Sequence, residues 1–383
     1  MFDRILFAGY SFMDYTWKLI VPGSLSAYYP YPDTPYSAIY YVAPIAAMGL
    51  IAFVISKMKN RTIAFGSAFY VANIFLLLQL LPVGGAMMAE RYSYLCSIGL
   101  FFIAGKGLID LSENYKLKPY KYVFIAVAIG YGGYLFHESH ERNKVWNNSG
   151  ALWQNVVSQY KRVPIAYNNL GSYYQKHDNL DSALMNFNEA IRLKSTFPEA
   201  LTNRSDIFRV KGNYQMAVAD CDTAIKEDPG YVEAHMNRGI AYCHLNKYDD
   251  ALRDFNFVAA RKSGDPSLYM NRGNLYDMKG KIDSAYSDYS MVIQLDPNNA
   301  DAYASRGRAD VERSKFKEGL EDINTAISMH ASSPVAYYFR SKANAGVGNY
   351  SAALQDAMTA KNSGFQIDDA YISELKKRAE GNK

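Results

Sequence analysis

The sequence predicts an all-α protein in two parts: a bundle of about four transmembrane helices, followed by an α-solenoid. Two observations carry this prediction. Within the first 137 residues, apolar stretches recur that approach the roughly 20 residues a helix needs to cross a bilayer. From Pro164 onward the chain resembles itself every 34 residues, a period typical of stacked helix pairs.

The charge distribution also separates the two parts. Residues 1–150 contain 12 Lys/Arg and 8 Asp/Glu, and the remainder contains 29 of each, so the net charge of +4 belongs to the first part. A neutral second part without a basic stripe argues against nucleic-acid binding. Three cysteines without a CxxC pair predict neither a disulfide framework nor a metal site.

Residues 1–36 are expected to lie at the membrane surface. In residues 1–20, apolar side chains such as Phe2 and Leu6 alternate with charged ones such as Asp3 and Arg4, which is typical of an interfacial amphipathic helix. A Pro- and Tyr-rich extracytoplasmic loop follows, made extended by its prolines.

Residues 37–137 form the predicted transmembrane bundle, with spans at about 37–56, 62–81, 94–111 and 120–136. The last span contains Gly130, Gly132 and Gly133, which would let a neighbouring helix approach closely. Lys106 and Asp110 lie four residues apart near the end of the third span, and we expect them to form an ion pair.

The basic residues of the short loops predict the orientation of the bundle. Lys57, Lys59 and Arg61 follow the first span, and Lys116, Lys118 and Lys121 follow the third. Both loops should be cytoplasmic, which makes the chain an integral membrane protein. Everything after residue 137 is then extracytoplasmic, on the periplasmic side if the protein is bacterial.

A connecting helix is predicted for residues 138–163. The stretch HESHE at 137–141 carries two His and two Glu but lacks the HExxH spacing of a zinc helix. We interpret it as a solvated turn at the interface.

The repeat units begin at residues 164, 198, 232, 266, 300 and 334, and together they cover residues 164–367. Small residues recur at positions eight, twenty and twenty-seven of the unit, and aromatic residues at positions eleven and twenty-four. This is the packing pattern of tetratricopeptide repeats, so the sequence predicts six of them. Residues 368–383 are expected to form a capping helix and tail.

A charge pattern runs through five of the six units. Position seven is Arg and position twenty-three is Asp in units two to six, whereas unit one has Leu170 and Asn186. The members appear and disappear together, which predicts a structural ion-pair ladder within each unit or to the next one: Arg204, Asp220, Arg238, Asp254, Arg272, Asp288, Arg306, Asp322, Arg340 and Asp356.

The residues at position six are candidates for lining a peptide-binding groove. They are Asn169, Asn203, Asn237 and Asn271 in the first four units, on the helix face expected to line the concave groove. Side-chain amides both donate and accept, so such a row can bind an extended backbone. The alternative is that Asn is simply common at this position of the repeat.

Three segments add a family resemblance: LIVPGSLSAYYPYP (19–32), AERYSYLCSIGL (89–100) and RNKVW with ALW (142–153). In this order, before tetratricopeptide repeats, they resemble the TMTC-type O-mannosyltransferase-like proteins and their bacterial relatives. These are multi-spanning GT-C-type glycosyltransferases that use a polyprenyl-phosphate sugar. The resemblance covers only the C-terminal portion of that architecture, so the N-terminal catalytic half is expected to be absent.

By this resemblance, Arg91 could contact the lipid phosphate while Glu90 orients it. The alternative is a structural ion pair that braces the loop against Tyr92 and Tyr94. No catalytic residue and no cofactor are predicted, and the chain is not expected to be active alone.

The predicted function is therefore a membrane-anchored scaffold that binds a protein or peptide in its repeat groove on the extracytoplasmic face. The alternative is the C-terminal part of a polyprenyl-phosphate-sugar-dependent protein O-glycosyltransferase.

Overall fold

The computed structural model describes residues 2–23, 25–78, 87–88, 94–114, 118–329 and 333–381. Their regular secondary structure is helical, apart from one antiparallel bridge between Tyr29 and Met88. The chain divides into two compact units, one ending at Ser195 and one starting at Thr196.

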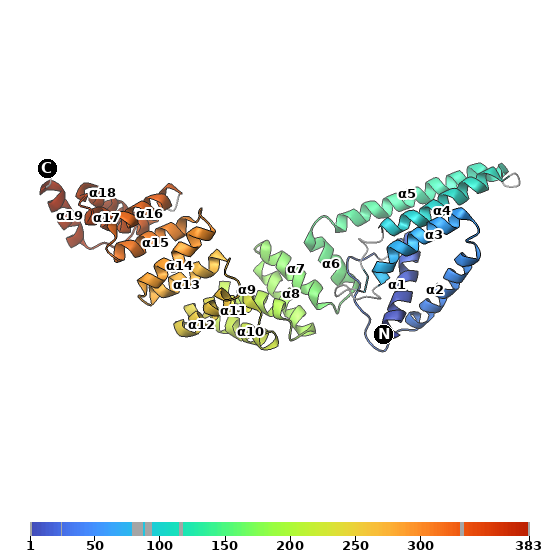
Figure 1. Ribbon diagram of the computed structural model, residues 1–383, viewed down its shortest axis with the longest axis horizontal. Coiled ribbons are helices and arrows are strands. Elements are labelled where there is room, and N and C mark those ends of the chain that lie inside the picture. The colour runs from blue at the N-terminus through green and yellow to red at the C-terminus, as the bar shows by residue number, and fades with distance from the viewer. Residues whose placement is uncertain are drawn as a thin grey trace. The chain divides into compact units, whose positions relative to one another are not determined.

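The first unit contains two sets of helices (Figure 1). The N-terminal set is α1 Phe2–Ile20, α2 Ile39–Ser56, α3 Arg61–Ile74, the 3-10 turn η1 Phe75–Leu78, α4 Tyr94–Glu113, the 3-10 turn η3 Lys118–Tyr120 and α5 Lys121–Val145. The second set is α6 Ser149–Gln159, α7 Pro164–Lys176 and α8 Leu180–Leu193.

Helix α1 packs against α2 and contributes Phe7, Phe12 and Tyr15 to the buried core of this set. The amphipathic pattern read in residues 1–20 therefore describes a helix whose apolar face meets other helices. Trp17 and Ile20 remain exposed on its other side.

Close helix packing occurs between α3 and α4. A Cβ atom on Gly99 would lie 2.3 Å from the carbonyl oxygen of Gly66, so only glycine permits this approach. The prediction that Gly130, Gly132 and Gly133 admit a neighbouring helix is not confirmed, because a Cβ on any of them would meet nothing within 4 Å among the described residues.

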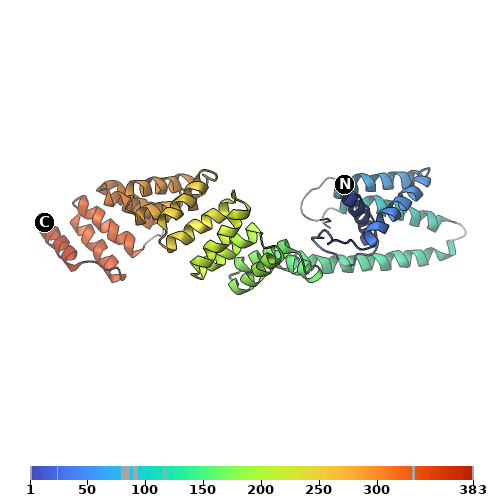
Figure 2. The same ribbon diagram turned by 90° about the horizontal axis from the view of Figure 1, so that it is seen from below.

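Helix α5, the long helix in teal in Figure 2, is continuous from Lys121 to Val145. The prediction of a turn at residues 137–141 is therefore wrong. None of these residues breaks a helix, and no Gly or Pro interrupts the chain between them and Asn148, which caps α6.

Within the part of the chain that the structure describes, α2 alone is long and apolar enough to cross a membrane. The second predicted span is described only to residue 78, as α3 and the turn η1. The prediction of four spans is not confirmed. Lys106 and Asp110 do pair on α4, with 2.6 Å between nitrogen and oxygen.

The second unit is a series of antiparallel helix pairs in which each helix packs on its partner and pairs stack on the next (Figures 1 and 2). Its helices are α9 Pro198–Val210, α10 Tyr214–Glu227, α11 Val232–His244, α12 Tyr248–Ala259, α13 Pro266–Met278, α14 Ile282–Leu295, α15 Ala300–Glu312, α16 Phe316–Ser328, α17 Pro334–Gly346, α18 Tyr350–Asn362 and α19 Asp369–Gly381.

Complementary side-chain sizes explain the packing inside each pair. A Cβ on Gly239 would lie 2.8 Å from the ring of Phe255, and one on Gly273 would lie 2.8 Å from the ring of Tyr289. Where position eight is Ser instead of Gly, position twenty-four is smaller: Ser205 occurs with Cys221, and Ser341 with Ala357. A larger residue at position eight therefore occurs with a smaller one at position twenty-four.

The end of the unit is covered by α19. Its Ile372 and Leu375 are buried against residues of α18 such as Ala357, and the Tyr371 hydroxyl lies 3.0 Å from Ser341 Oγ. Polar residues cover the outer side of α19.

Candidate functional site

Each ladder arginine binds the aspartate of its own unit through two parallel hydrogen bonds. Nε and Nη2 of Arg238 donate to the two carboxylate oxygens of Asp254 at 2.8 and 2.7 Å. The same forked geometry occurs in the other four pairs, with distances of 2.6–2.9 Å. The five aspartates are buried.

Three of these arginines also contact the preceding unit. Nη1 of Arg238 donates to Asp222 at 2.6 Å, and the same atoms of Arg272 and Arg340 donate to Asn256 at 2.9 Å and Asn324 at 3.2 Å. The ladder therefore joins partners within a unit and between units. The carboxylates and amides at position twenty-five were missed in the sequence, although they recur 34 residues apart from Asp222 to Asn256.

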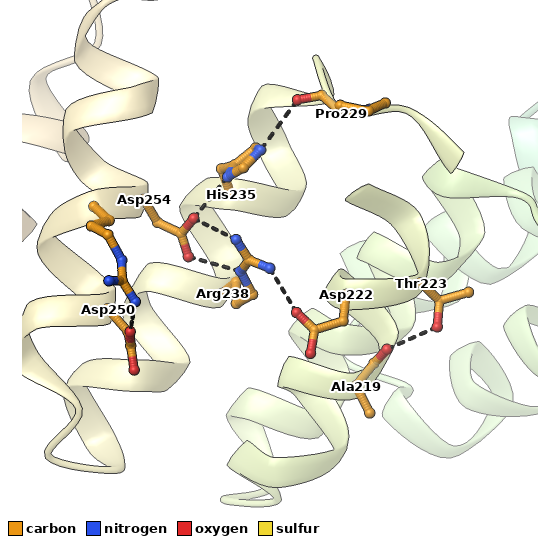
Figure 3. A network of polar contacts seen from close by, with 9 residues as sticks. Ala219, Asp222, Thr223, Pro229, His235, Arg238, Asp250 and Asp254 are labelled. Carbon is orange, nitrogen blue, oxygen red and sulfur yellow. Dashed lines mark hydrogen bonds and ion pairs between the residues drawn. The ribbon is translucent and has the colours of Figure 1, made fainter. Parts of the chain in front are cut away.

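The polar network around Arg238 also contains His235 (Figure 3). His235 Nδ1 lies 2.7 Å from Asp254, its Nε2 lies 3.3 Å from the Pro229 carbonyl oxygen, and its ring stacks on Phe257. Hydrogen bonds to Asp254, and secondarily to Asp222, raise the pKa of Arg238 above its ordinary value, while burial opposes them. These contacts fix the relative register of neighbouring helices.

The four predicted asparagines lie half-buried on α7, α9, α11 and α13. Asn237 Nδ2 donates to the Thr202 carbonyl oxygen at 3.2 Å and to Ser205 Oγ at 3.3 Å, both on α9. Asn271 Nδ2 donates to Ser267 of its own helix at 2.8 Å. These amide donors have partners inside the protein, so contact between the asparagine row and a peptide stays a prediction.

A groove of about 440 Å³ lies in the second compact unit, after the asparagine row. It is formed between the first helices of three successive pairs, α13, α15 and α17. Its walls are apolar at Met270, Met278, Val335 and Phe339. Position six, which carries Asn in the earlier units, is Ser305 and Phe339 here.

Polar groups of this groove are held in place by neighbouring helices. Arg308 on α15 forms an ion pair with Asp277 on α13. The Tyr289 hydroxyl donates to Asn274 at 3.0 Å, and burial raises the pKa of Tyr289 to about 12, so the hydroxyl keeps its proton at neutral pH. The groove thus combines apolar walls with a few oriented polar groups, as ligand-binding clefts do.

The lipid-phosphate candidates Glu90 and Arg91 lie outside the described residues. Among the residues that are described, no group of three or more His, Cys, Asp or Glu is arranged to hold a metal ion.

Models of the tetratricopeptide repeat match residues 168–232, 221–253 and 266–299. These residues form tetratricopeptide repeats. The helix pairs that follow, α15 with α16 and α17 with α18, begin at the same 34-residue interval.

Protein O-mannosyl-transferase Tmtc3 of Drosophila melanogaster is 25% identical to this chain over 156 residues. The match covers 39% of the chain and 16% of that relative. The chain therefore spans only a small part of its curated relative.

Among solved structures, the chain is similar to YrrB, described as a tetratricopeptide repeat protein with an unusual peptide-binding site, at 21% identity, 48% coverage of the chain, 95% of YrrB and a TM-score of 0.41. A tetratricopeptide repeat protein from Parabacteroides merdae is 21% identical, with 64% of this chain and 97% of that protein covered and a TM-score of 0.43. PilF of Pseudomonas aeruginosa is 13% identical, with 56% of this chain and 96% of PilF covered and a TM-score of 0.49.

Proposed function

We propose that this protein is a membrane-anchored scaffold whose repeats bind an extended protein segment on the extracytoplasmic face. The groove between α13, α15 and α17 is the observation that carries the proposal. Its apolar walls favour a segment that inserts one apolar side chain, while Asn274 and Ser305 are placed to meet the polar backbone beside that anchor.

Membrane anchoring is supported by the exposed apolar surface of the first helices. Ile45 and Phe53 on α2 are 66% and 60% exposed, and Ile129 and Phe136 on α5 are 71% and 75% exposed. Apolar surface on this scale marks contact with lipid or with another protein. With the basic loop at residues 57–61 in the cytoplasm, the three further crossings that the sequence predicts at about 62–81, 94–111 and 120–136 would make the repeats extracytoplasmic.

The groove is tested by selecting binding peptides against the purified full chain and measuring their Kd by fluorescence anisotropy. Phe339→Ala should weaken binding roughly tenfold or more, because truncating an apolar anchor removes a large share of the binding energy. Met278→Ala should also weaken it. Met216→Ala on α10 is a matched control, since Met278 and Met216 are 56% and 53% exposed. Equal affinities for all variants would place the peptide elsewhere.

The similarity to Tmtc3 favours a second candidate, the C-terminal part of a polyprenyl-phosphate-sugar-dependent protein O-glycosyltransferase. In that case the repeats hold the acceptor protein, and Arg91 with Glu90 contacts the lipid phosphate. Reading the coding frame upstream of Met1 tests it. Further membrane spans with an acidic extracytoplasmic loop favour the enzyme, and a stop codon favours the scaffold.

A further inference from the structure

We propose that the helices α1–α5 bind one glycerophospholipid of the bilayer, with an acyl chain in an apolar cleft and the phosphate beside Lys18 and Arg142. This rests on the proposal that these helices lie in a membrane. It concerns residues remote from the peptide groove and distinct from Glu90 and Arg91.

The apolar cleft has a volume of about 610 Å³, within the range of about 300–1,000 Å³ that is typical of small-molecule sites. Its walls include Leu50 and Val54 of α2, Val71 of α3, and Leu100 and Ala104 of α4.

The hydroxyl groups of Thr16, Tyr70 and Tyr131, which line the cleft, have partners within the protein. Those of Thr16 and Tyr70 lie 2.8 Å from each other, and the Tyr131 hydroxyl donates to the Ile20 carbonyl oxygen at 2.8 Å. The cleft therefore suits a hydrocarbon chain. A peptide would leave its own backbone groups without hydrogen bonds there.

A second pocket of about 280 Å³ adjoins the cleft, and the two share Leu19 and Phe101 as lining residues. The charged residues lining it are Lys18, Glu138 and Arg142.

Both cations are held in position at this pocket. Lys18 Nζ lies 2.7 Å from Asp14 Oδ2 and 4.0 Å from the centre of the Tyr29 ring. Arg142 Nη1 donates to Asn155 at 3.0 Å. An ammonium group has three N–H donors and a guanidinium has five, so both side chains can also donate to a phosphate.

The order of the two pockets along the helices matches a lipid in a bilayer. The charged pocket lies at the last turns of α1 and the polar end of α5, whereas the cleft is lined by Leu50 and Val54 from the apolar part of α2. A lipid likewise has its phosphate at the interface and its chains at membrane depth. A free phosphate ion would leave the apolar cleft unused.

The test measures phospholipid retained by the full chain after extraction from membranes in dodecyl maltoside, by native mass spectrometry and phosphate analysis. Ala104→Trp fills the cleft, and Arg142→Gln removes one cation. The controls are Ala46→Trp on the exposed face of α2 and Lys144→Gln on α5, which is exposed and pairs with Glu141. Circular dichroism and gel filtration verify that each variant is folded.

We expect about one phospholipid per wild-type chain, and roughly tenfold less in Ala104→Trp and Arg142→Gln, the scale of one hydrogen bond to a charged group. Both controls should match the wild type. Absence of bound phospholipid in the wild type, or equal retention in Ala104→Trp and Ala46→Trp, would overturn the proposal.

A second measurement needs no variant. A phospholipid with a diazirine on its acyl chain should label residues 50–71 and 100–104 of the wild-type chain in nanodiscs, and labelling spread evenly over the exposed faces of α2 and α5 would contradict the site. The two proposals can fail separately, because they are tested by different readouts. If the scaffold proposal fails, no peptide affinity is measured, whereas lipid retention still responds to Ala104→Trp. If only the lipid proposal fails, peptide affinity is still measured and lipid retention does not respond to Ala104→Trp.

Discussion

At the scale of single residues, two pairings shape the repeat array: the forked Arg–Asp pair of units two to six, and the Gly or Ser that faces position twenty-four in every unit. The first was predicted from the sequence because both members change together in unit one. The second contact from Nη1 to the preceding unit was not, because it joins positions seven and twenty-five across two units. Buried pairs of this kind are expected to define register more than to add stability.

Repeat unit one, which has Leu170 and Asn186 where the others have Arg and Asp, shows which replacement tests this expectation. Arg272→Leu should lower the free energy of unfolding by about 3–5 kcal/mol, because it leaves the buried carboxylate of Asp288 unpaired. Adding Asp288→Asn copies Leu170 and Asn186 and should restore most of the loss. Urea unfolding followed by circular dichroism measures both. Equal stability of the single and double variants would show that the pair is not coupled.

The glycine pairing predicts a size limit. Gly239→Ala should lower stability by about 1–3 kcal/mol, because its Cβ would crowd the Phe255 ring in a packed core. Gly264→Ala, whose Cβ meets nothing within 4 Å, is the matched control. The double change Gly239→Ser with Phe255→Cys copies Ser205 and Cys221 and should be less damaging than Gly239→Ser alone. A neutral Gly239→Ala would refute the volume argument.

Burial also predicts the reactivity of the thiols. It raises the pKa of Cys221 to about 12 and that of Cys243 to about 11. The thiolate is the reactive form, and at pH 8 almost none is present when the pKa lies this far above the pH. Iodoacetamide should therefore label both slowly at pH 8 until urea unfolds the repeats, and mass spectrometry identifies the labelled residue. Rapid labelling of Cys221 in the folded protein would contradict its burial.

At the scale of helices, the sequence predicts the repeat array better than the first set of helices. The same packing constraint recurs in the sequence of every repeat, so the 34-residue period alone predicts that helices start at Pro198, Val232 and Pro266. In the N-terminal set, apolar stretches locate helices without their ends or contacts. Thus α5 continues through residues 137–145, and close packing uses Gly66 with Gly99, which lie far apart in sequence and share no local pattern.

The packing of α3 on α4 can be tested with a matched pair of variants. Gly99→Val should lower the thermal unfolding temperature in detergent, because its Cβ would collide with the Gly66 backbone and force the helices apart. Gly105→Val on the same helix adds the same side chain where a Cβ meets nothing within 4 Å. Equal unfolding temperatures for the two would contradict the close approach.

At the scale of the whole molecule, the repeats supply the proposed peptide-binding surface and the first helices supply the proposed anchor. The sequence predicted a groove but placed its ligand contacts on the asparagine row. A further cavity, which the sequence did not predict, lies where that row ends and is formed by Met270, Arg308 and Phe339 from three helices. Arg308 and Phe339 have no counterpart at the same position of another repeat unit, so they leave no periodic signal.

The most direct test of the scaffold proposal is photo-crosslinking of a bound peptide in membranes. A photoreactive amino acid is placed at Ala304 in the groove or at Glu318, which is exposed on α16, and a selected peptide is added from the extracytoplasmic side. Crosslinking at position 304, abolished by Phe339→Ala and absent at position 318, is the predicted result. Equal crosslinking at both positions, or crosslinking only when the peptide reaches the cytoplasmic side, would contradict the account.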